Sequence, residues 1–461
     1  MSPPDDDLEG RLPGIRNAAE LATTPARRTA IACLEAGLRA GHPRAVVPDA
    51  VRIEGDELVV AGARYDLASV DRVLVLGGGK AAPGVASALE AVLGDRLTGG
   101  AVVGTEPAET TAVEGLVGDH PVPSARSVAA TRRVLDLAAG ADASTLVLAV
   151  VAGGGSALLA APAAGVELGD LQSVTEALLA AGASIHELNA VRSHCSAVKG
   201  GGLARAATPA RTVGLVVSDV VGDDPGVVAS GPTAPDPSTY AEARAVLDRY
   251  HVRAPAAVRD RLAAGVAGEL PETPDASVPV FERVANHVIA SNATALAAAR
   301  EVAVARGYEP CLLSSRLRGE ARAAAPTVVA VAEEVRASGN PVRPPAVLLA
   351  GGECTVRVTG PGRGGPNLEF ALAAAIELAD DAGGSTRIAL ASVDTDGVDG
   401  TARAAGGLVD PTTVADVVAA RAALDANDAE PFLAERGALV LTGPTGTNLN
   451  DLRVVVVEAE P

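Results

Sequence analysis

The sequence predicts an α/β protein of two domains, and three observations carry this prediction. Short runs rich in Val and Leu alternate with longer Ala-rich amphipathic segments, which is the pattern of parallel strands joined by helices. At 461 residues the chain exceeds what one hydrophobic core usually serves. Hydrophobic residues make up 48% of the chain and aromatic residues only 2%, so two cores can form from Ala, Val and Leu.

The apolar runs are expected to form buried strands. They lie at residues 72–76, 145–151, 212–217, 346–350, 387–393 and 438–442. Polar segments rich in Pro interrupt the pattern at residues 270–279 and 339–345, and the second is the better linker because a compact Gly-rich region follows it. An uncharged stretch at residues 145–166 is long enough to span a bilayer, but a Gly-Gly-Gly-Ser turn and a proline interrupt it. We therefore expect a strand, a turn and a helix there.

The charge of the chain argues against nucleic acid and anionic membranes as partners. The net charge is −19, with 57 acidic residues against 38 Lys and Arg. Lys80 and Lys199 are the only lysines, so nearly every basic residue is an arginine. A halophilic cytoplasm or a GC-rich genome would deplete Lys in this way. If the habitat is salty, activity should drop sharply on dialysis into low-salt buffer.

The cysteines and the start of the chain indicate a cytoplasmic protein. Scattered single cysteines without a C-x-x-C pair are typical of reduced cytosolic proteins and do not form a zinc motif. They are Cys33, Cys195, Cys311 and Cys354. The first ten residues carry neither a basic nor an apolar region, so we expect no signal peptide.

Three glycine runs are candidate anion sites. The first predicted strand leads into Gly77-Gly78-Gly79-Lys80, and residues 153–156 form a Gly-Gly-Gly-Ser run after the next buried strand. Backbone N–H groups at such turns can surround a phosphate, and a lysine retained among so many arginines points to a need for its compact ammonium. Lys199 precedes a third run at residues 200–202. The alternative for each is a tight turn with a solvated or capping lysine.

Acidic and polar loops follow several of the predicted strands. Residues 218–224 and 394–400 each carry three Asp residues, which suit Mg²⁺ coordination or a general base, although a solvated acidic loop is the alternative. The loop at residues 360–369 is rich in Gly and contains Arg363, and residues 442–448 offer hydroxyl and amide groups. Ligands bind at the carboxyl ends of open parallel sheets, so these loops predict a polar cleft.

The ordered set of motifs resembles the glycerate 2-kinase family, whose C-terminal part is the MOFRL domain. The matching segments are GGGKAA, GDHPVPS, AGGGSAL, NAVRSHCSAVKGGGLA, SDVVGDDPGVVASGPT, SNATAL, LSSRLRGEAR, GGECTV, DTDGVDG and TGPTGTNLNDL. The resemblance covers nearly the whole chain. It implies two α/β domains, the first Rossmann-like with a mainly parallel sheet, and an active site in the interdomain cleft. We place the glycerate kinase domain at residues 14–340, including a connecting segment at about 255–340, and the MOFRL domain at residues 345–456.

The resemblance also implies the reaction. Family members phosphorylate D-glycerate to 2-phosphoglycerate with ATP as co-substrate and Mg²⁺, and these small molecules are the partners we expect. A kinase for a related small sugar acid is an alternative. A homodimer is a fair expectation on base rates alone. No G-x-x-x-x-G-K-[ST] motif is present, so the chain is not an ordinary P-loop enzyme.

Site residues are carried over by position in the matching motifs. Lys80, Asp219 and Arg363 are the candidate catalytic residues, and Asp224, Asp394 and Asp396 are the candidate metal ligands. Which Asp takes the proton from the substrate's 2-hydroxyl is left open. The candidate substrate and phosphate ligands are Gly153, Gly154, Gly155, Ser156, Asn189, Arg192, Lys199, Gly364, Gly365, Asn367 and Asn448.

Two departures from the family pattern bear on activity. Many relatives have an arginine where Pro366 stands, and relatives tend to read Pro-Thr-Asp at residues 401–403, where this chain has Thr-Ala-Arg. Arg363, three residues before Pro366, has the reach and the donors to replace the missing cation, with Arg192 next in line. If the departures disable the site, the chain is a non-catalytic binding protein.

The strongest rival function is that of an NAD(P)H-dependent hydroxypyruvate reductase. Residues 77–82 formally fit the dinucleotide-binding pattern G-x-G-x-x-A, and Glu106 could meet a ribose hydroxyl. Relatives have carried this reductase label. A bulky lysine inside the pyrophosphate turn is unusual, however, and a reductase would leave the other polar loops without a role.

Overall fold

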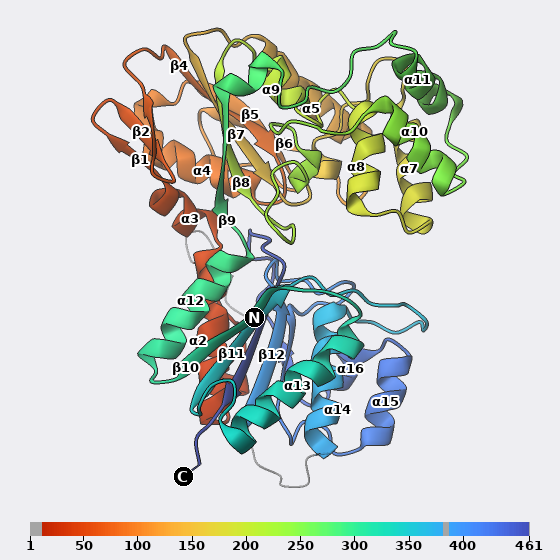
Figure 1. The fold of residues 1–461 in the computed structure, drawn as a ribbon. Coiled ribbons are helices and arrows are strands. Elements are labelled where there is room, and N and C mark those ends of the chain that lie inside the picture. The colour runs from red at the N-terminus through yellow and green to blue at the C-terminus, as the bar shows by residue number, and fades with distance from the viewer. Residues whose placement is uncertain (1–11, 381–386, 461) are drawn as a thin grey trace, which may run out of the picture. The chain divides into compact units, whose positions relative to one another are not determined.

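The computed structural model describes residues 12–380 and 387–460. The first ten residues, on which the prediction about a signal peptide depends, lie outside the described residues. The chain divides into two compact units, one of residues 46–289 and one of residues 1–45 with 290–461. This division does not coincide with the predicted boundary at residues 340–345. Residues 14–45 and 290–340 belong to the unit that contains the predicted MOFRL domain (Figure 1), because their helices pack on its sheet.

The unit of residues 46–289 is built on a six-stranded sheet with the order β6-β5-β4-β7-β8-β9. The strands from β4 to β8 pair in parallel. If the six strands are numbered 1 to 6 along the chain, their order in the sheet is 3-2-1-4-5-6, which is the Rossmann order. The predicted Rossmann-like sheet is therefore confirmed. The strands are β4 (Arg72–Gly78), β5 (Gly99–Gly104), β6 (Val113–Val117), β7 (Thr145–Ala152), β8 (Arg211–Val217) and β9 (Val284–Ala290).

Helices cover this sheet and extend beyond it. Apolar residues of β4, β5 and β7 form one cluster with α5 (Ala125–Ala139) and α9 (Gly202–Ala206), and α4 (Ala82–Leu93) packs on the same strands outside that cluster. A second cluster joins four helices that lie beside the sheet (Figure 1). These are α7 (Leu168–Ala180), α8 (Ile185–His194), α10 (Tyr240–Arg249) and α11 (Ala256–Val266).

Three smaller features complete this unit. A separate antiparallel sheet is formed by β1 (Val51–Glu54), β2 (Glu57–Val60) and β3 (Ala63–Asp66) after α3 (Pro43–Ala50). The uncharged stretch at residues 145–166 forms β7, a turn and the short α6 (Gly155–Leu158), as predicted. Over the described part of the chain, every helix is too short or too polar to cross a membrane.

The other unit contains a mixed six-stranded sheet with the order β10-β11-β15-β12-β13-β14. Only β10 and β11 pair in parallel, since β15 lies antiparallel between β11 and β12 and β13 lies antiparallel between β12 and β14. The parallel pattern expected from the sequence is therefore wrong for this sheet, although β10, β11, β12 and β14 share one direction. The strands are β10 (Glu309–Leu317), β11 (Ala346–Gly352), β12 (Ile388–Asp394), β13 (Gly406–Val409), β14 (Leu439–Val440) and β15 (Asp451–Val457).

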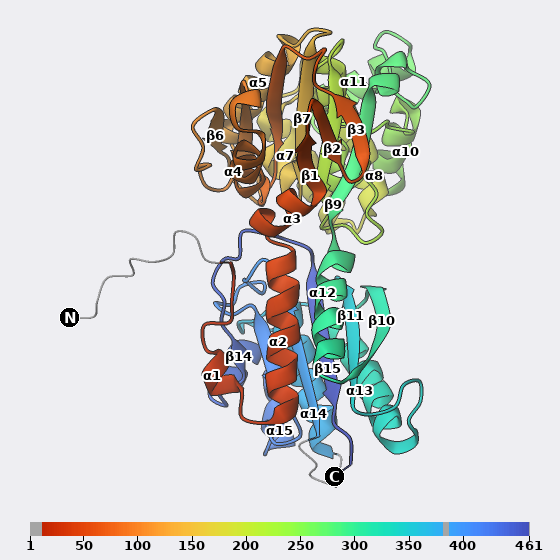
Figure 2. The same ribbon diagram turned by 90° about the vertical axis from the view of Figure 1, so that its left-hand side faces the viewer.

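Helices cover both faces of the mixed sheet. The helices α2 (Pro25–Ala40) and α12 (Asn292–Ala305) pack side by side on one face, as Figure 2 shows from that side. The helices α13 (Ala321–Ser338) and α14 (Pro366–Asp380) pack together on the other face and supply about half of a large apolar cluster. Shorter helices are α1 (Ala18–Leu21), α15 (Val417–Asp425) and α16 (Ala429–Ala434).

Candidate active site

The first group of predicted site residues meets where the order of the Rossmann-type sheet reverses. Strands β4 and β7 are neighbours there, and the loops after them carry Lys80 and Gly153. The Lys80 N–H donates to the Gly153 carbonyl at 2.8 Å. A methyl group on Gly153 would lie 2.2 Å from Asp219 Oδ2, in the loop after β8. Ligands bind at this position in doubly wound sheets, so the structure brings Lys80, Gly153 and Asp219 together at the expected place.

Asp219 lies in an unusual electrostatic environment. Burial raises the pKa of its carboxyl, and the positive charge of Lys80 and a hydrogen bond from the Gly154 N–H partly offset the effect. A carboxylate with a raised pKa holds a proton more readily than an exposed aspartate does. Asp219 is half-buried and lies against Gly153, whereas Asp224 is exposed, so Asp219 is the better candidate for a general base of the two predicted Asp residues in this loop.

A hydrogen-bonded chain supports the second glycine run. Ser156 Oγ lies 2.8 Å from Ser230 Oγ, and Ser230 Oγ donates to Asn189 Oδ1 at 2.9 Å. Ala229, Ser230 and Gly231 have successive positive φ angles of 52°, 61° and 62°. Such backbone costs about 1–3 kcal/mol for each non-glycine residue and is retained only where neighbouring contacts fix it. The strained turn holds Ser230 between Ser156 and Asn189.

Lys199 and Arg192 lie in the same region but differ in their contacts. Lys199 is buried, and its Nζ donates to the carbonyls of Ser156 at 2.7 Å and Leu159 at 3.2 Å. Burial, together with the nearby Arg192 charge, lowers the pKa of Lys199 to about 7. The half-buried guanidinium of Arg192 has no hydrogen bond or ion pair to another described residue, and burial lowers its pKa to about 10. Lys199 therefore supports the glycine run through these two bonds, whereas the Arg192 guanidinium makes no such contact with a described residue.

Asp224 is separate from this group. Its exposed carboxylate accepts a hydrogen bond from the Gly226 N–H at 2.8 Å and lines a cavity together with Asn189. No group of three or more acidic, His or Cys side chains placed to hold a metal exists among residues 12–380 and 387–460. Magnesium usually binds through one or two carboxylates together with substrate phosphates, so a pair of carboxylates suffices for it.

In the other unit, the glycine-rich loop packs on Asp399. A methyl group on Gly365 would lie 2.5 Å from Asp399 Cγ, so this close approach requires glycine. The neighbouring Gly364 pairs with Thr401 through its N–H and its carbonyl. Burial raises the pKa of Asp399 to about 7, while hydrogen bonds from the Asn367 and Leu368 N–H groups act against that rise. By accepting these two hydrogen bonds, Asp399 caps the start of α14.

Asn367 is fully buried and uses its side-chain groups within the protein. Its Nδ2 donates to Asp399 Oδ1 at 3.2 Å and to Asp451 Oδ1 at 2.7 Å, and its Oδ1 accepts from Ser392 Oγ at 2.6 Å. A substrate could reach this amide only by breaking those bonds. The contacts therefore fit a positioning role better than the predicted contact with substrate.

Asp394 and Asp396 lie together at the end of β12. The Asp396 N–H donates to Asp394 Oδ1 at 3.0 Å. Burial raises the pKa of Asp394 well above its usual range, and the negative charges of Asp396 and Asp451 add to the effect. A cation would relieve that repulsion, so the pair fits a divalent ion.

Arg363 and Asn448 occupy exposed or half-exposed loops of the same unit. Arg363 has a side chain that is 58% exposed, and its Nε lies 3.6 Å from Glu430 Oε2, a loose ion pair. Asn448 Oδ1 accepts from the Asn450 N–H at 3.1 Å. Pro366 begins α14, a position where proline is well tolerated.

Comparisons with known proteins identify the family. Residues 29–263 match a family described as a domain of unknown function (DUF4147), and residues 346–451 match the MOFRL family. A D-glycerate 2-kinase of Thermotoga maritima is 39% identical over 396 residues, which cover 84% of this chain and 91% of the relative. This chain belongs to the glycerate 2-kinase family. The resemblance predicted from the motifs is confirmed.

A solved structure and a further relative are also similar to this member of the glycerate 2-kinase family. The crystal structure of a glycerate kinase from Thermotoga maritima has a TM-score of 0.79 and 36% identity, covering 93% of this chain and 99% of the other. A putative hydroxypyruvate reductase of Agrobacterium vitis is 41% identical over 394 residues, covering 84% of this chain and 87% of the relative. The names glycerate kinase and putative hydroxypyruvate reductase thus both occur among similar chains.

Three residues outside the predicted set of site residues also shape the candidate site. The His120 ring lies against Gly154, since a methyl group on Gly154 would lie 3.2 Å from His120 Cδ2 and 3.0 Å from Lys80 Cγ. Ser230 links the glycine run to Asn189, and Asp399 anchors the loop around Gly365. Each lies inside a motif that carries the family resemblance, so the motif itself was the available signal.

Proposed function

We propose that this protein transfers the γ-phosphoryl group of ATP, with Mg²⁺, to the 2-hydroxyl of D-glycerate and so forms 2-phosphoglycerate. The observation that carries the proposal is the meeting of Lys80, the Gly153 turn and Asp219 at the switch point of a Rossmann-ordered sheet. Phosphoryl transfer depends on positioning and charge neutralisation, and these groups can supply both. Membership of the glycerate 2-kinase family supports the same substrates.

The contacts of each residue suggest its role in phosphoryl transfer. The Lys80 ammonium and the N–H groups after Gly153 neutralise phosphate oxygens, while Asp219 accepts the proton of the substrate hydroxyl. Arg192, which lacks another ionic partner among the described residues, pairs with the substrate's carboxylate or with a phosphate. Asn189 and Ser156 orient the same groups. Lys199 keeps the glycine run in place through its two carbonyl contacts.

The remaining predicted residues complete the proposal. Mg²⁺, when bound, would offset the charge of the phosphates, and its predicted ligands are Asp394 with Asp396 in one unit and Asp224 in the other. Arg363 supplies the cation that Pro366 lacks. We place the reaction in the cytoplasm, since all four cysteines are free thiols.

Besides the name of the Agrobacterium vitis relative, the reductase alternative is supported by the glycine pattern at the end of β4. Those glycines have another explanation, because methyl groups on Gly77 and Gly79 would lie 2.0 Å from the Val150 carbonyl oxygen and 2.5 Å from the Ala152 carbonyl oxygen. Close pairing of β4 with β7 therefore demands glycine without any dinucleotide. The pattern alone does not favour a reductase.

A paired assay tests the proposal. The purified protein is given ATP, Mg²⁺ and D-glycerate while ADP release is followed, and in parallel it is given NADH or NADPH with hydroxypyruvate while absorbance at the nicotinamide band is followed. We expect glycerate-dependent ADP release and no reduced-nicotinamide consumption. The opposite pattern would establish a reductase, and inactivity in both assays would indicate a binding protein.

A further inference from the structure

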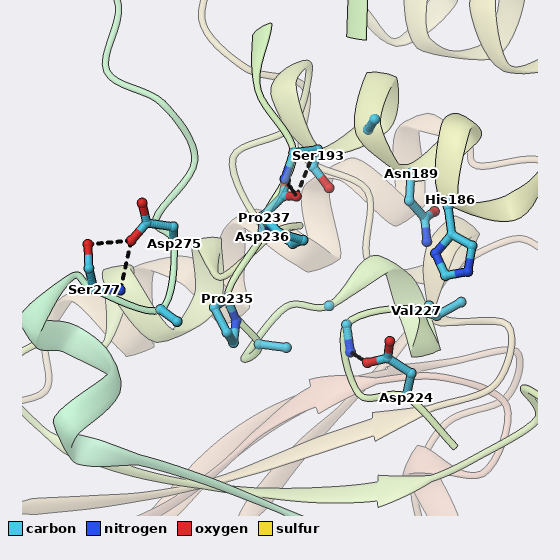
Figure 3. Close-up of a pocket in the computed structure, with 17 residues that line it drawn as sticks. His186, Asn189, Ser193, Asp224, Val227, Pro235, Asp236, Pro237, Asp275 and Ser277 are labelled. Carbon is cyan, nitrogen blue, oxygen red and sulfur yellow. Dashed lines mark hydrogen bonds between the residues drawn. The ribbon is translucent and has the colours of Figure 1, made fainter. Parts of the chain in front are cut away.

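The unit of residues 46–289 contains a cavity of about 700 Å³. Its wall is formed by α8, the loop from Asp224 to Ser238 and the loop from Asp275 to Ser277. Figure 3 shows Asn189 and His186 of α8 on one side of the view and Asp275 with Ser277 on the other. Ligand pockets for small molecules commonly have volumes of roughly 300–1,000 Å³, so this cavity is of suitable size.

The cavity adjoins the proposed phosphate site through Asn189. The Oδ1 atom of Asn189 accepts from Ser230 Oγ at 2.9 Å, and Ser230 Oγ lies 2.8 Å from Ser156 Oγ in the glycine run. Gly231, which follows Ser230 in the strained turn, also lines the cavity. A ligand that fills the cavity can therefore continue toward Ser156 at its Asn189 end.

Two buried polar atoms of the cavity wall have no hydrogen-bond partner. They are Asn189 Nδ2, a donor on a side chain that is 8% exposed, and Asp236 Oδ2, an acceptor. The other oxygen of Asp236 is already used, since Oδ1 accepts from the Ser238 N–H at 2.9 Å and from Ser238 Oγ at 2.6 Å. Leaving a buried polar group without a partner is energetically costly. A ligand that pairs with both atoms would recover that cost.

The composition of the wall selects the kind of ligand. Asp224, Asp236 and Asp275 line the cavity together with serine hydroxyls, and neither Lys nor Arg is present in the described lining. Phosphate groups are therefore disfavoured inside it. Carboxylates accept hydrogen bonds from ribose hydroxyls, and apolar surfaces such as those of Val227 and Pro235 can contact a flat ring.

We propose that this cavity binds the adenosine half of ATP, with Asp236 accepting from the ribose hydroxyls and Asn189 Nδ2 donating to the nucleotide. The phosphates then leave the cavity toward Ser156 and Ser230. This inference rests on the proposed kinase function and adds to it the place where the donor nucleoside lies. It also adds Asp236, which the motifs did not indicate, as a residue that determines nucleotide affinity.

Asp236→Asn is the informative variant, because its side-chain oxygen can keep the two Ser238 contacts while the unpaired acceptor becomes a donor. Calorimetric titration measures the binding of ADP and of inorganic tripolyphosphate, which lacks the nucleoside. We expect the variant to bind ADP at least tenfold more weakly than wild type, with tripolyphosphate affinity and the KM for D-glycerate changed less than twofold. Asp260→Asn, an exposed substitution on α11 away from the cavity lining, is the matched control and should bind both ligands as wild type does.

Each outcome bears on one proposal. Unchanged ADP affinity in Asp236→Asn, or an equal loss of tripolyphosphate binding, would overturn the adenosine site. A second variant, Ala276→Phe, places a ring at the cavity wall and should also weaken ADP more than tripolyphosphate, so misfolding of one variant does not end the test. If wild type binds ADP through Asp236 but phosphorylates no glycerate, the adenosine site stands and the proposed kinase function fails. If NADH binds in a way that depends on Asp236 and ADP does not bind, ATP is not the nucleotide that this cavity holds.

Discussion

Lys80 lies where β4 turns into α4, with its N–H fixed by the Gly153 carbonyl and its side chain against Gly154. If its ammonium contacts the transferring phosphate, Lys80→Ala should lower kcat by about 10³-fold or more, since cations at this step carry effects of that size. The free energy of unfolding should change little. Lys80→Arg should not restore activity, because a planar guanidinium does not replace a compact ammonium.

Steady-state kinetics and denaturant unfolding check this prediction. Arg259→Ala is the matched control. It removes an exposed cation of α11 whose side chain has no hydrogen bond or ion pair with another described residue. It should retain wild-type turnover. If Lys80→Ala keeps most of its activity, Lys80 belongs to the structure of the turn and not to the chemistry.

Arg363 is the residue we expect to replace the family's arginine at Pro366. Its exposed side chain and loose contact with Glu430 leave it able to reach a ligand. Arg363→Ala should lower turnover at least tenfold, an increase of about 1.4 kcal/mol in the barrier. Adding Pro366→Arg should recover part of the loss.

The matched control for Arg363 is Arg357→Ala, an exposed arginine of the same connecting segment without a recorded side-chain contact. Turnover is measured for all three variants at saturating ATP and D-glycerate. Wild-type turnover in Arg363→Ala would mean that another residue supplies the charge, and Arg192→Ala is then the next variant to measure.

At the scale of elements, the turn after β7 depends on the absence of a side chain at Gly153. A methyl group there would lie 2.2 Å from Asp219 Oδ2, so Gly153→Ala must push Asp219 or the turn aside. We expect turnover to fall at least tenfold and stability to fall by about 1–3 kcal/mol, the usual cost of overpacking.

Gly169→Ala in α7 is the matched control for Gly153→Ala. Nothing lies within 4 Å of the added methyl group, and the helical backbone there suits alanine. This variant should keep full activity and gain up to about 1 kcal/mol of stability. Chemical denaturation and turnover are measured for both variants. Equal behaviour of the two would contradict the packing of Gly153 on Asp219.

The sequence predicts the strands of this fold better than their partners. The expected runs at residues 72–76 and 145–151 correspond to β4 and β7 with ends one or two residues away, because continuous Val and Leu runs mark buried strands locally. Pairing direction is not local. Strand β15 lies antiparallel between β11, about a hundred positions earlier in the chain, and β12, about sixty positions earlier, and no local pattern encodes this pairing.

The candidate site likewise has features that the sequence predicts locally and features that depend on the tertiary structure. Glycine turns and their neighbours at strand ends are readable from sequence, and Lys80, Gly153 and Asp219 do meet. Whether a polar side chain faces a ligand or the core is a tertiary property, as Asn367 illustrates with its buried bonds to Asp399 and Asp451. The cavity beside Asp236 depends on α8 and on loops that come from other parts of the chain.

For the molecule as a whole, the most direct measurement is ³¹P NMR of the product formed from D-glycerate, ATP and Mg²⁺. A phosphate on the 2-hydroxyl couples to the proton of C2, whereas a phosphate on the 3-hydroxyl couples to the two protons of C3, so the spectrum distinguishes the two products. The account predicts a single phosphomonoester with the coupling of 2-phosphoglycerate, and ADP in equal amount. A 3-phosphoglycerate signal, or no phosphomonoester while hydroxypyruvate is reduced, would contradict it.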